Sequence, residues 1–321
     1  MMTNKINSKE AATLLKNADN ILILAHKNPD GDTLGSAFAL LRVLKKLSKN
    51  AFVDCSDEIP PKYSYMWEGI ENIRIENPDF VVCVDIADIK LLGGENTSKY
   101  EGKVNLCIDH HMSNTQYAQN LFLRECAATC EIIYEVIENL EAELDKGIAD
   151  CIYTGLSTDT GCFRYSNVTP STHILAAKML ELDADFDTIN RVMFETKTRA
   201  YLKLEELVLN SIEMYYGGKC AVITITQEMF RQSGSNESEC DGIASLPRKI
   251  EGVLVGISIR ERTDGTFKVS LRTYEPINAA QVCGKFGGGG HARAAGCEFS
   301  DDFEASKKKL LDTIKEELES I

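Results

Sequence analysis

The first half of the chain alternates short, fully apolar runs with segments of helical period. The apolar runs predict buried strands at 20–26, 50–55, 80–86 and 103–109. Apolar residues three and four positions apart predict helices at 8–18, 34–49, 130–144, 146–159 and 171–182, with Ser8 as the N-cap of the first. Strands that are apolar on both faces and alternate with helices are typical of a parallel sheet, so we predict an α/β fold.

The pattern changes after residue 187. Residues 196–216 have the period of one long helix, which Gly217 and Gly218 would end. Strands are then predicted at 219–225, 252–262 and 266–274, and a hairpin at Asp264–Gly265 joins the last two. We therefore predict three parts: a parallel-sheet domain over 1–187, a connector helix region over 188–216 and a smaller α+β domain over 217–321.

The 321-residue chain is acidic, with a net charge of −14. That charge argues against a track for long nucleic acid, but it leaves room for a small anionic substrate at a local site. No apolar run approaches the roughly 20 residues of a membrane span, and the first residues lack the apolar core of a secretory signal. The 11 cysteines contain no C-x-x-C pair, which indicates reduced thiols in a cytoplasmic protein and disfavours a zinc cluster.

Acids and histidines gather where the predicted strands end. In an open parallel sheet the carboxyl ends of the strands form the edge where ligands bind. Carboxylate and imidazole ligands without thiolates suit Mn²⁺ or a similar cation. Each motif alone has a plainer interpretation, since an aspartate after a strand is often a turn former or a helix cap. The occurrence of four such motifs in one chain favours a metal site. Its candidate residues are His26, Asp30, Asp32, Asp85, Asp109, His110, His111 and Asp159.

Five sequence motifs together resemble a known enzyme family. "HKNPDGDTLGS", "VDIAD", "DHH" and "STDTGCFR" resemble, in order, the four motifs of the DHH phosphoesterase superfamily. The segment "FGGGGHARAAG" at 286–296 resembles the signature of the DHH-associated substrate-binding domain. The resemblance spans nearly the whole chain. It implies a two-domain fold that hydrolyses phosphoesters in the cleft between its domains.

The resemblance also implies roles for individual residues. Two Mn²⁺ ions are expected, with Mg²⁺ as the alternative metal. One ion would be held by His26, Asp30 and Asp85, and the other by Asp32, Asp85, His110 and Asp159, with Asp85 between them. His111 would face the substrate phosphate. The catalytic residues expected on this pattern are Asp85, His110, His111 and Asp159.

A second group of residues is expected to hold the substrate. Successive glycines before a helical "HARAA" stretch would direct backbone N–H groups at an anion. Arg272 can fork onto phosphate oxygens, although pairing with Glu261 across the sheet is the alternative. The glycine run alone is also compatible with a flexible turn. The expected substrate contacts are His111, Arg164, Arg272, Gly288, Gly289, Gly290 and His291.

The family type that the chain resembles hydrolyses very short oligoribonucleotides (nanoRNA) and 3′-phosphoadenosine 5′-phosphate (pAp). We therefore expect an enzyme that acts on these substrates. A phosphodiesterase for cyclic dinucleotides or pApA is the enzymatic alternative, because only the second domain would distinguish the two. A non-catalytic nucleotide sensor is the alternative from another class, but it predicts a damaged metal set. A homodimer is compatible with the sequence.

Overall fold

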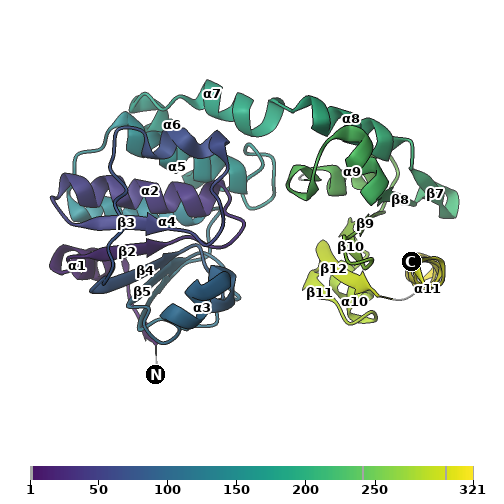
Figure 1. Ribbon diagram of the computed structural model, residues 1–321, viewed down its shortest axis with the longest axis horizontal. Helices are drawn as coiled ribbons and strands as arrows, with labels where there is room; N and C mark the ends of the chain where they lie inside the picture. Colours follow the sequence, from purple (N-terminus) through teal and green to yellow (C-terminus); the bar gives the residue numbers. More distant parts are fainter. Residues whose placement is uncertain (1–2, 241, 301, 321) are drawn as a thin grey trace. The chain divides into compact units, whose positions relative to one another are not determined.

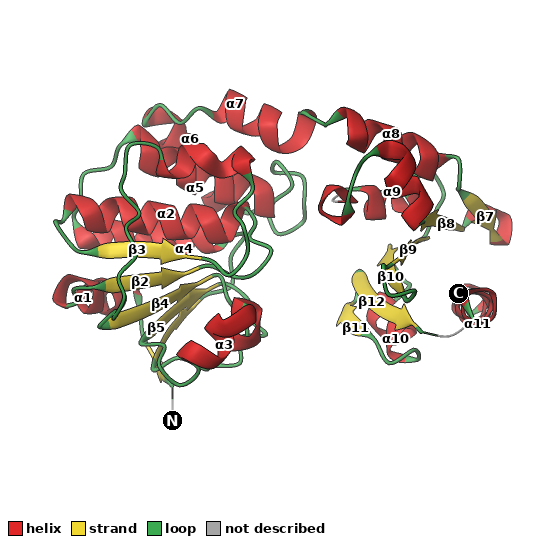
Figure 2. Ribbon diagram, in the orientation of Figure 1, coloured by secondary structure: helices red, strands yellow, loops and turns green. Residues whose placement is uncertain are grey.

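The computed structural model describes residues 3–240, 242–300 and 302–320. The chain divides into two compact units, Met1–Thr196 and Lys197–Ile321 (Figure 1). The first unit contains a six-stranded parallel sheet covered by helices, and the second contains a six-stranded mixed sheet (Figure 2). No helix within the described ranges is both long and apolar enough to cross a membrane.

The elements have the following bounds. The strands are β1 (Asn4–Lys5), β2 (Ile21–Leu24), β3 (Ala51–Asp54), β4 (Phe80–Val84), β5 (Leu106–Asp109), β6 (Asn120–Leu123), β7 (Glu213–Tyr215), β8 (Cys220–Ile225), β9 (Val255–Glu261), β10 (Phe267–Thr273), β11 (Gly289–His291) and β12 (Ala294–Phe299). The α-helices are α1 (Ser8–Asn17), α2 (Gly31–Lys46), α3 (Gly94–Tyr100), α4 (Thr129–Leu140), α5 (Lys146–Asp159), α6 (Pro170–Glu181), α7 (Phe186–Asn190), α8 (Arg199–Leu209), α9 (Gln227–Ser233), α10 (Ala279–Gly284) and α11 (Phe303–Glu319).

The first sheet confirms the predicted parallel α/β architecture. Its strand order is β1-β6-β5-β4-β2-β3, and every neighbouring pair is parallel. Ile21 and Ile23 pack into one core with α1, α2, α4, α5 and α6, whereas Leu22 and Leu24 pack into a second core on the α3 side. All four are fully buried, and each such side chain stabilises the fold by roughly 1.5–3 kcal/mol. The fully apolar run therefore becomes a central strand.

Helix α2 begins three residues earlier than its apolar period predicted. Asp30 is its N-cap, and the Asp30 carboxylate accepts hydrogen bonds from the backbone N–H groups of Asp32 at 3.0 Å and Thr33 at 3.1 Å. Asp32 and Thr33 look like loop residues in the sequence, but both are buried in the first turn. The first helix differs in the same way, because its N-cap is Asn7 and not Ser8.

Glycines bring α2 and α5 unusually close together. A Cβ added at Gly35 would lie 2.4 Å from the carbonyl oxygen of Cys151, and one at Gly31 would lie 2.4 Å from Oγ1 of Thr158. A Cβ at Gly155 would lie 2.7 Å from the Asp32 carboxylate. This close packing brings the first turn of α2 against the last turn of α5.

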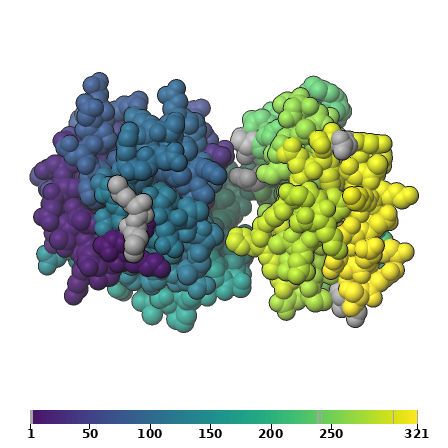
Figure 3. Space-filling view, turned by 90° about the horizontal axis from the view of Figure 1, so that it is seen from below, coloured from purple at the N-terminus to yellow at the C-terminus, as the bar shows by residue number. Residues whose placement is uncertain are grey.

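The second sheet has the order β11-β12-β10-β9-β8-β7, and only β8 and β9 pair in parallel. Helices α10 and α11 contribute to the core on one face, whereas α8 and α9 pack against β8 on the other. The predicted hairpin joins β9 and β10, and Gly265 adopts the expected positive φ of 83°. Helix α11 buries Leu310, Leu311 and Ile314 in this core, and the C-terminal part of the chain, yellow in Figure 3, forms part of the surface of the unit.

Two elements of the second unit differ from the sequence prediction. The long helix predicted over 196–216 is wrong, because α8 ends at Leu209 and Glu213–Tyr215 pairs with β8 as strand β7. The Ser211 hydroxyl bonds the carbonyl oxygens of Val208 and Thr224 where the chain leaves the helix. The helical "HARAA" stretch is also wrong, because His291 ends strand β11, residues 292–293 form a turn, and Ala294 begins the antiparallel strand β12.

The close approach of α2 and α5 predicts that one added methyl group between the helices lowers the stability of the fold. Gly35→Ala should lower the free energy of unfolding by about 1–3 kcal/mol, because the new Cβ overlaps the Cys151 carbonyl. Gly284→Ala is the control, since nothing lies within 4 Å of its Cβ position. Urea unfolding of the full chain measures both. Equal stability of Gly35→Ala and the wild type would show that the helices separate without cost.

Candidate metal centre

The predicted ligands lie where strand order reverses in the first sheet. Strand β3 pairs on one side of β2, and β4, β5 and β6 follow on the other side. His26 follows β2, Asp85 follows β4 and His110 follows β5. A reversal of this kind is the usual ligand-binding position of an open α/β sheet. The Thr33 side chain lies at the same position, because its hydroxyl donates to the Val84 carbonyl at 3.1 Å.

His26 and His110 each direct one ring nitrogen, Nε2, toward two carboxylates. Nδ1 of His26 lies 2.7 Å from the Lys27 carbonyl oxygen, and Nδ1 of His110 lies 3.0 Å from that of Cys126. A carbonyl only accepts, so Nδ1 carries the proton in both rings. When Nε2 carries no proton, its lone pair is the one that can bind a metal.

The Nε2 atoms are surrounded by acidic oxygens. Nε2 of His26 lies 3.7 Å from both Oδ1 of Asp30 and Oδ2 of Asp85. Nε2 of His110 lies 3.6 Å from Oδ1 of Asp85 and 3.5 Å from Oδ2 of Asp159. Ligand atoms that share one cation at about 2.1 Å are separated by roughly 3–4 Å, so these spacings fit a shared ion.

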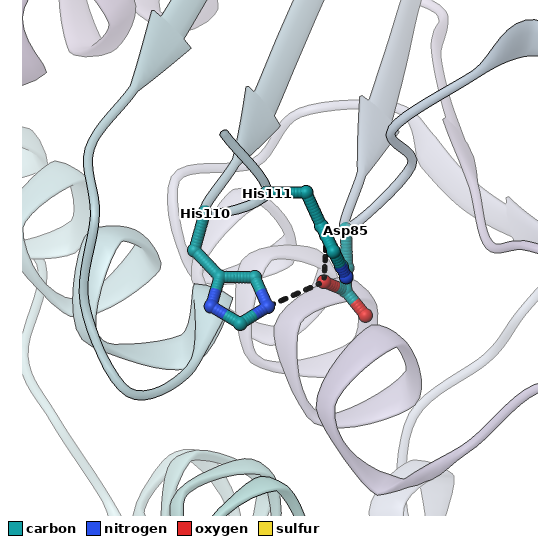
Figure 4. A group of neighbouring side chains, drawn as sticks. All are labelled: Asp85, His110 and His111. Carbon is teal, nitrogen blue, oxygen red and sulfur yellow. Dashed lines mark ion pairs between the residues drawn. The ribbon is translucent and has the colours of Figure 1, made fainter. Parts of the chain in front are cut away.

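The described residues form three groups whose donor atoms lie within 4.8 Å of one another. His26, Asp30 and Asp85 make one group, and Asp32, His110 and Asp159 make another. The third joins Asp85 to His110 and His111 (Figure 4). Asp85 thus belongs to two of the groups and lies 3.6 Å from a histidine of the third. The first group contains the residues of one expected set, the second lacks Asp85 of the other expected set, and the third contains His111, which was expected to face the substrate phosphate.

The carboxylates at this site are buried and repel one another, so a positive charge would stabilise them. Burial raises the pKa values of Asp32 and Asp85, and each is further raised by the charge of a neighbouring aspartate. Burial and the charge of Asp85 raise the pKa of Asp159 to about 7. Burial alone would lower the pKa of His26, but hydrogen bonds with Asp30 and Asp85 raise it to about 10. A divalent cation would satisfy the same demand, and the oxygen and nitrogen donors fit one.

Backbone donors fix the two most deeply buried carboxylates. Asp32 accepts from the N–H groups of Thr129 at 2.6 Å and Cys130 at 2.9 Å, at the positive end of α4. Asp85 has a φ of 59°, a left-handed conformation that is unfavourable for a residue with a side chain. Its N–H donates to the Ile108 carbonyl, and its carboxylate accepts from the Thr129 hydroxyl at 2.8 Å. The scaffold therefore orients both groups before any ion binds.

Sequence reasoning listed Asp109 among the candidate residues but assigned it to neither ion, and the structure places it in contact with His111. The Asp109 carboxylate is fully buried and accepts from Nδ1 of His111 at 2.8 Å and from the Asn114 side chain at 2.7 Å. The hydrogen bond that His111 donates to Asp109 raises the pKa of His111 to about 9. Only the position of Asp109, directly before two histidines, hinted at this arrangement. Asn114 carried no signal in the sequence.

The remaining expected contacts are distributed over both units. Arg164 is exposed, and its Nε donates to the Gly161 carbonyl at 2.5 Å. Arg272 faces Gly256 across the β9–β10 pair, so the alternative of a cross-strand partner at Glu261 is wrong. His291 is exposed on edge strand β11.

The glycine run is partly explained by the fold itself. The N–H of Gly288 already donates to the Cys283 carbonyl, and a Cβ there would lie 2.1 Å from the Gly296 oxygen. A Cβ at Gly290 would lie 2.6 Å from the Ala294 oxygen. Gly289 is different, because nothing lies within 4 Å of its Cβ position. Close strand packing therefore requires Gly288 and Gly290, but it does not require Gly289.

Comparisons with known proteins agree with this arrangement. The family model for the N-terminal domain of the DHH family matches residues 20–156, and the DHHA1 domain model matches residues 217–320. A bifunctional oligoribonuclease and PAP phosphatase, NrnA, from Thermus thermophilus is 30% identical over 306 residues, or 93% of this chain and 90% of that protein. The chain belongs to the DHH family.

Other DHH-type proteins extend the comparison. A cyclic-di-AMP phosphodiesterase, PdeA, from Listeria monocytogenes is 24% identical over 96% of this chain but only 49% of its own length. A crystal structure of an exopolyphosphatase-related protein from Bacteroides fragilis matches with a TM-score of 0.85 and 25% identity, covering 98% of this chain and 96% of that one. The DHH protein described here is thus a phosphoesterase, a hydrolase of ester bonds.

The raised pKa of Asp159 predicts that the folding stability of the metal-free DHH protein depends on pH. The unfolded state releases the Asp159 proton near its usual pKa of 3.8, but the folded state releases it only near pH 7. Stability should therefore fall as pH rises from about 4 to 7. Asp159→Asn should remove this loss. The stability of the variant relative to the wild type should therefore increase from pH 4 to pH 7 and stay constant above pH 7.

Thermal unfolding in EDTA at several pH values measures this gain. The control is Asp150→Asn, because Asp150 pairs with Lys146 outside the metal groups. A stability difference between Asp159→Asn and the wild type that does not change between pH 4 and 7 would contradict the charge repulsion.

Proposed function

We propose that this protein uses two Mn²⁺ ions, with Mg²⁺ as the alternative, to hydrolyse very short oligoribonucleotides and pAp, releasing AMP and phosphate from pAp. The observation that carries the proposal is the Asp85 carboxylate, whose two oxygens face His26 on one side and His110 on the other. On this proposal, His26, Asp30 and Asp85 hold one ion. Asp32, Asp85, His110 and Asp159 hold the second, so Asp85 contacts both.

Bound divalent cations would supply a water of lowered pKa and would neutralise charge on the phosphoryl oxygens. The chain's own groups then orient the reactants. His111 is fixed through Nδ1 by Asp109, so Nε2 is the ring nitrogen left to contact a substrate, and the side chain is partly exposed. In the metal-free site, the hydrogen bond to Asp109 raises the pKa of His111 to about 9. A protonated His111 can donate from Nε2 to a substrate phosphate or a leaving oxygen. Arg164 adds an exposed guanidinium for the same phosphate.

Substrate length follows from charge. The net charge of −14 repels additional phosphates outside a local site, so a long strand gains nothing from its length. Arg272, Gly289 and His291 are the proposed contacts for the substrate in the second unit. The name of the Thermus thermophilus relative supports short RNA and pAp as substrates. The name of the Listeria monocytogenes relative supports the alternative, cleavage of cyclic dinucleotides or pApA.

A product time course on 5′-labelled RNA of two, five, ten and twenty nucleotides tests the proposal. Parallel reactions contain pAp, pApA or cyclic di-AMP. We expect activity to be highest on pAp and on RNA of two to five nucleotides, lost in EDTA and restored by Mn²⁺. The penalty for length should shrink at higher salt, where surface repulsion is screened over about 10 Å or less.

Each other outcome points to a different function. Equal rates on two and twenty nucleotides would contradict the absence of a strand-binding track. Turnover confined to cyclic di-AMP or pApA would favour the phosphodiesterase alternative. Binding of nucleotides without turnover in Mn²⁺ would leave a sensor, which the intact set of donors argues against.

A further inference from the structure

The second sheet has one face in a core and another that helices cover only in part. Val269, Leu271 and Thr273 of β10 are buried on the core face. On the opposite face, α8 and α9 pack over Ile223 and Ile225 of β8. The part of that face formed by β10, β12 and β11 carries short or polar residues instead. These residues are Ser270, Arg272, Ala294, Gly296, Gly289 and His291.

Strand register places two basic residues on this open part. Arg272 is directly opposite Ala294, and Ala294 is directly opposite His291. Directly opposed residues point to the same face of a sheet, so Arg272 and His291 flank a single methyl group. Tyr274 lies two residues beyond Arg272, and its N–H continues the ladder to the Leu254 carbonyl. The period of two places Tyr274 on the same face, where 48% of it is exposed.

A third basic residue, Arg248, reaches this face from a short 3-10 helix over Pro247–Lys249. A Cβ at Gly256, directly opposite Arg272, would lie 2.6 Å from the backbone nitrogen of Arg248. The Arg248 backbone therefore lies against the sheet beside Arg272. Its guanidinium carbon lies 5.3 Å from the centre of the Tyr274 ring, an arrangement that fixes the guanidinium plane.

Among the described residues, no acidic partner of Arg248 explains this position. Its Nε is buried without a hydrogen-bond partner among the described residues, and no described carboxylate forms an ion pair with it. Acidic residues outnumber basic ones, 49 to 35, and several other arginines are paired with them, as Arg231 is with Glu228 and Arg262 with Glu298. A buried donor of this kind needs an acceptor from outside the described residues, and an anion beside the unpaired guanidinium would supply one.

We propose that Arg248, together with Arg272, binds a phosphate monoester of the substrate that is not cleaved. The inference rests on the proposed function for the identity of the substrate, although Arg248 lies outside all five sequence motifs. A guanidinium forks onto two phosphate oxygens, and the Tyr274 ring orients that fork. The small residues beside Arg272 leave space for the phosphate. Arg248 thus selects nucleotides that carry a terminal phosphate.

Calorimetric binding of AMP and of adenosine to the full chain in EDTA tests the proposal. EDTA removes the metal-dependent contribution and prevents turnover. The wild type should bind AMP more tightly than adenosine. Arg248→Met keeps a long side chain over Tyr274 but removes the charge, so its AMP affinity should fall about tenfold or more while adenosine affinity stays unchanged. Arg231→Met, at an exposed ion pair, is the matched control and should bind both ligands as the wild type does.

The outcomes separate the phosphate site from the proposed function. Wild-type AMP affinity in Arg248→Met, or equal wild-type affinities for AMP and adenosine, overturns the Arg248 assignment even if RNA is hydrolysed. An Arg248-dependent preference for AMP, without hydrolysis of short RNA or pAp, keeps the phosphate site and overturns the function. Arg248→Lys serves if the Met variant unfolds. Arg248→Lys should lose AMP affinity several-fold, because an ammonium lacks the paired N–H donors of a guanidinium. Wild-type AMP affinity in Arg248→Lys would contradict the proposal.

Discussion

Repulsion among buried carboxylates at one edge of the first sheet is the constraint on which the site depends. Asp32 and Asp85 are almost completely buried, and Asp159 lies close enough that the charge of Asp85 raises its pKa. Without a cation, this cluster destabilises the fold. When a cation is bound, its attraction to the carboxylates offsets the repulsion among them. The proposed chemistry uses that arrangement, because a site that demands positive charge also stabilises a phosphoryl group through the ions it holds.

The surrounding structure holds the acids together against this repulsion. The glycines of α2 and α5 permit a close helix contact, which brings Asp32 near the end of α5. The first N–H groups of α4 bond both oxygens of Asp32, and Thr129 bonds Asp85. Packing and backbone hydrogen bonds therefore offset an electrostatic cost that the acids alone could not overcome.

Much of this organisation was predictable from sequence, because buried parallel strands have a simple pattern. Apolar runs located strands β2, β3, β4 and β5, although β1 and β6 were not predicted. The carboxyl ends of parallel strands meet at one edge, which located a candidate site there, and the family resemblance supplied the two ligand sets. Long-range contacts were not predictable in this way. Asp32 and Thr33 look like loop residues until α4 and β4 bury them. The role of Asp109 depends on Asn114 and His111 folding back onto it, and the pairing of β11 with β12 overrides the helical propensity of "HARAA".

Anomalous diffraction from crystals grown with Mn²⁺ tests the central claim most directly. The account predicts two manganese peaks in the first unit, with one carboxylate oxygen of Asp85 in contact with each. Crystals of Asp85→Asn should lose at least one peak, whereas Asp88→Asn, in the same "VDIAD" segment but outside the metal groups of the described residues, should keep both. A single peak in the wild type, or two peaks that persist in Asp85→Asn, would contradict the bridging role of Asp85.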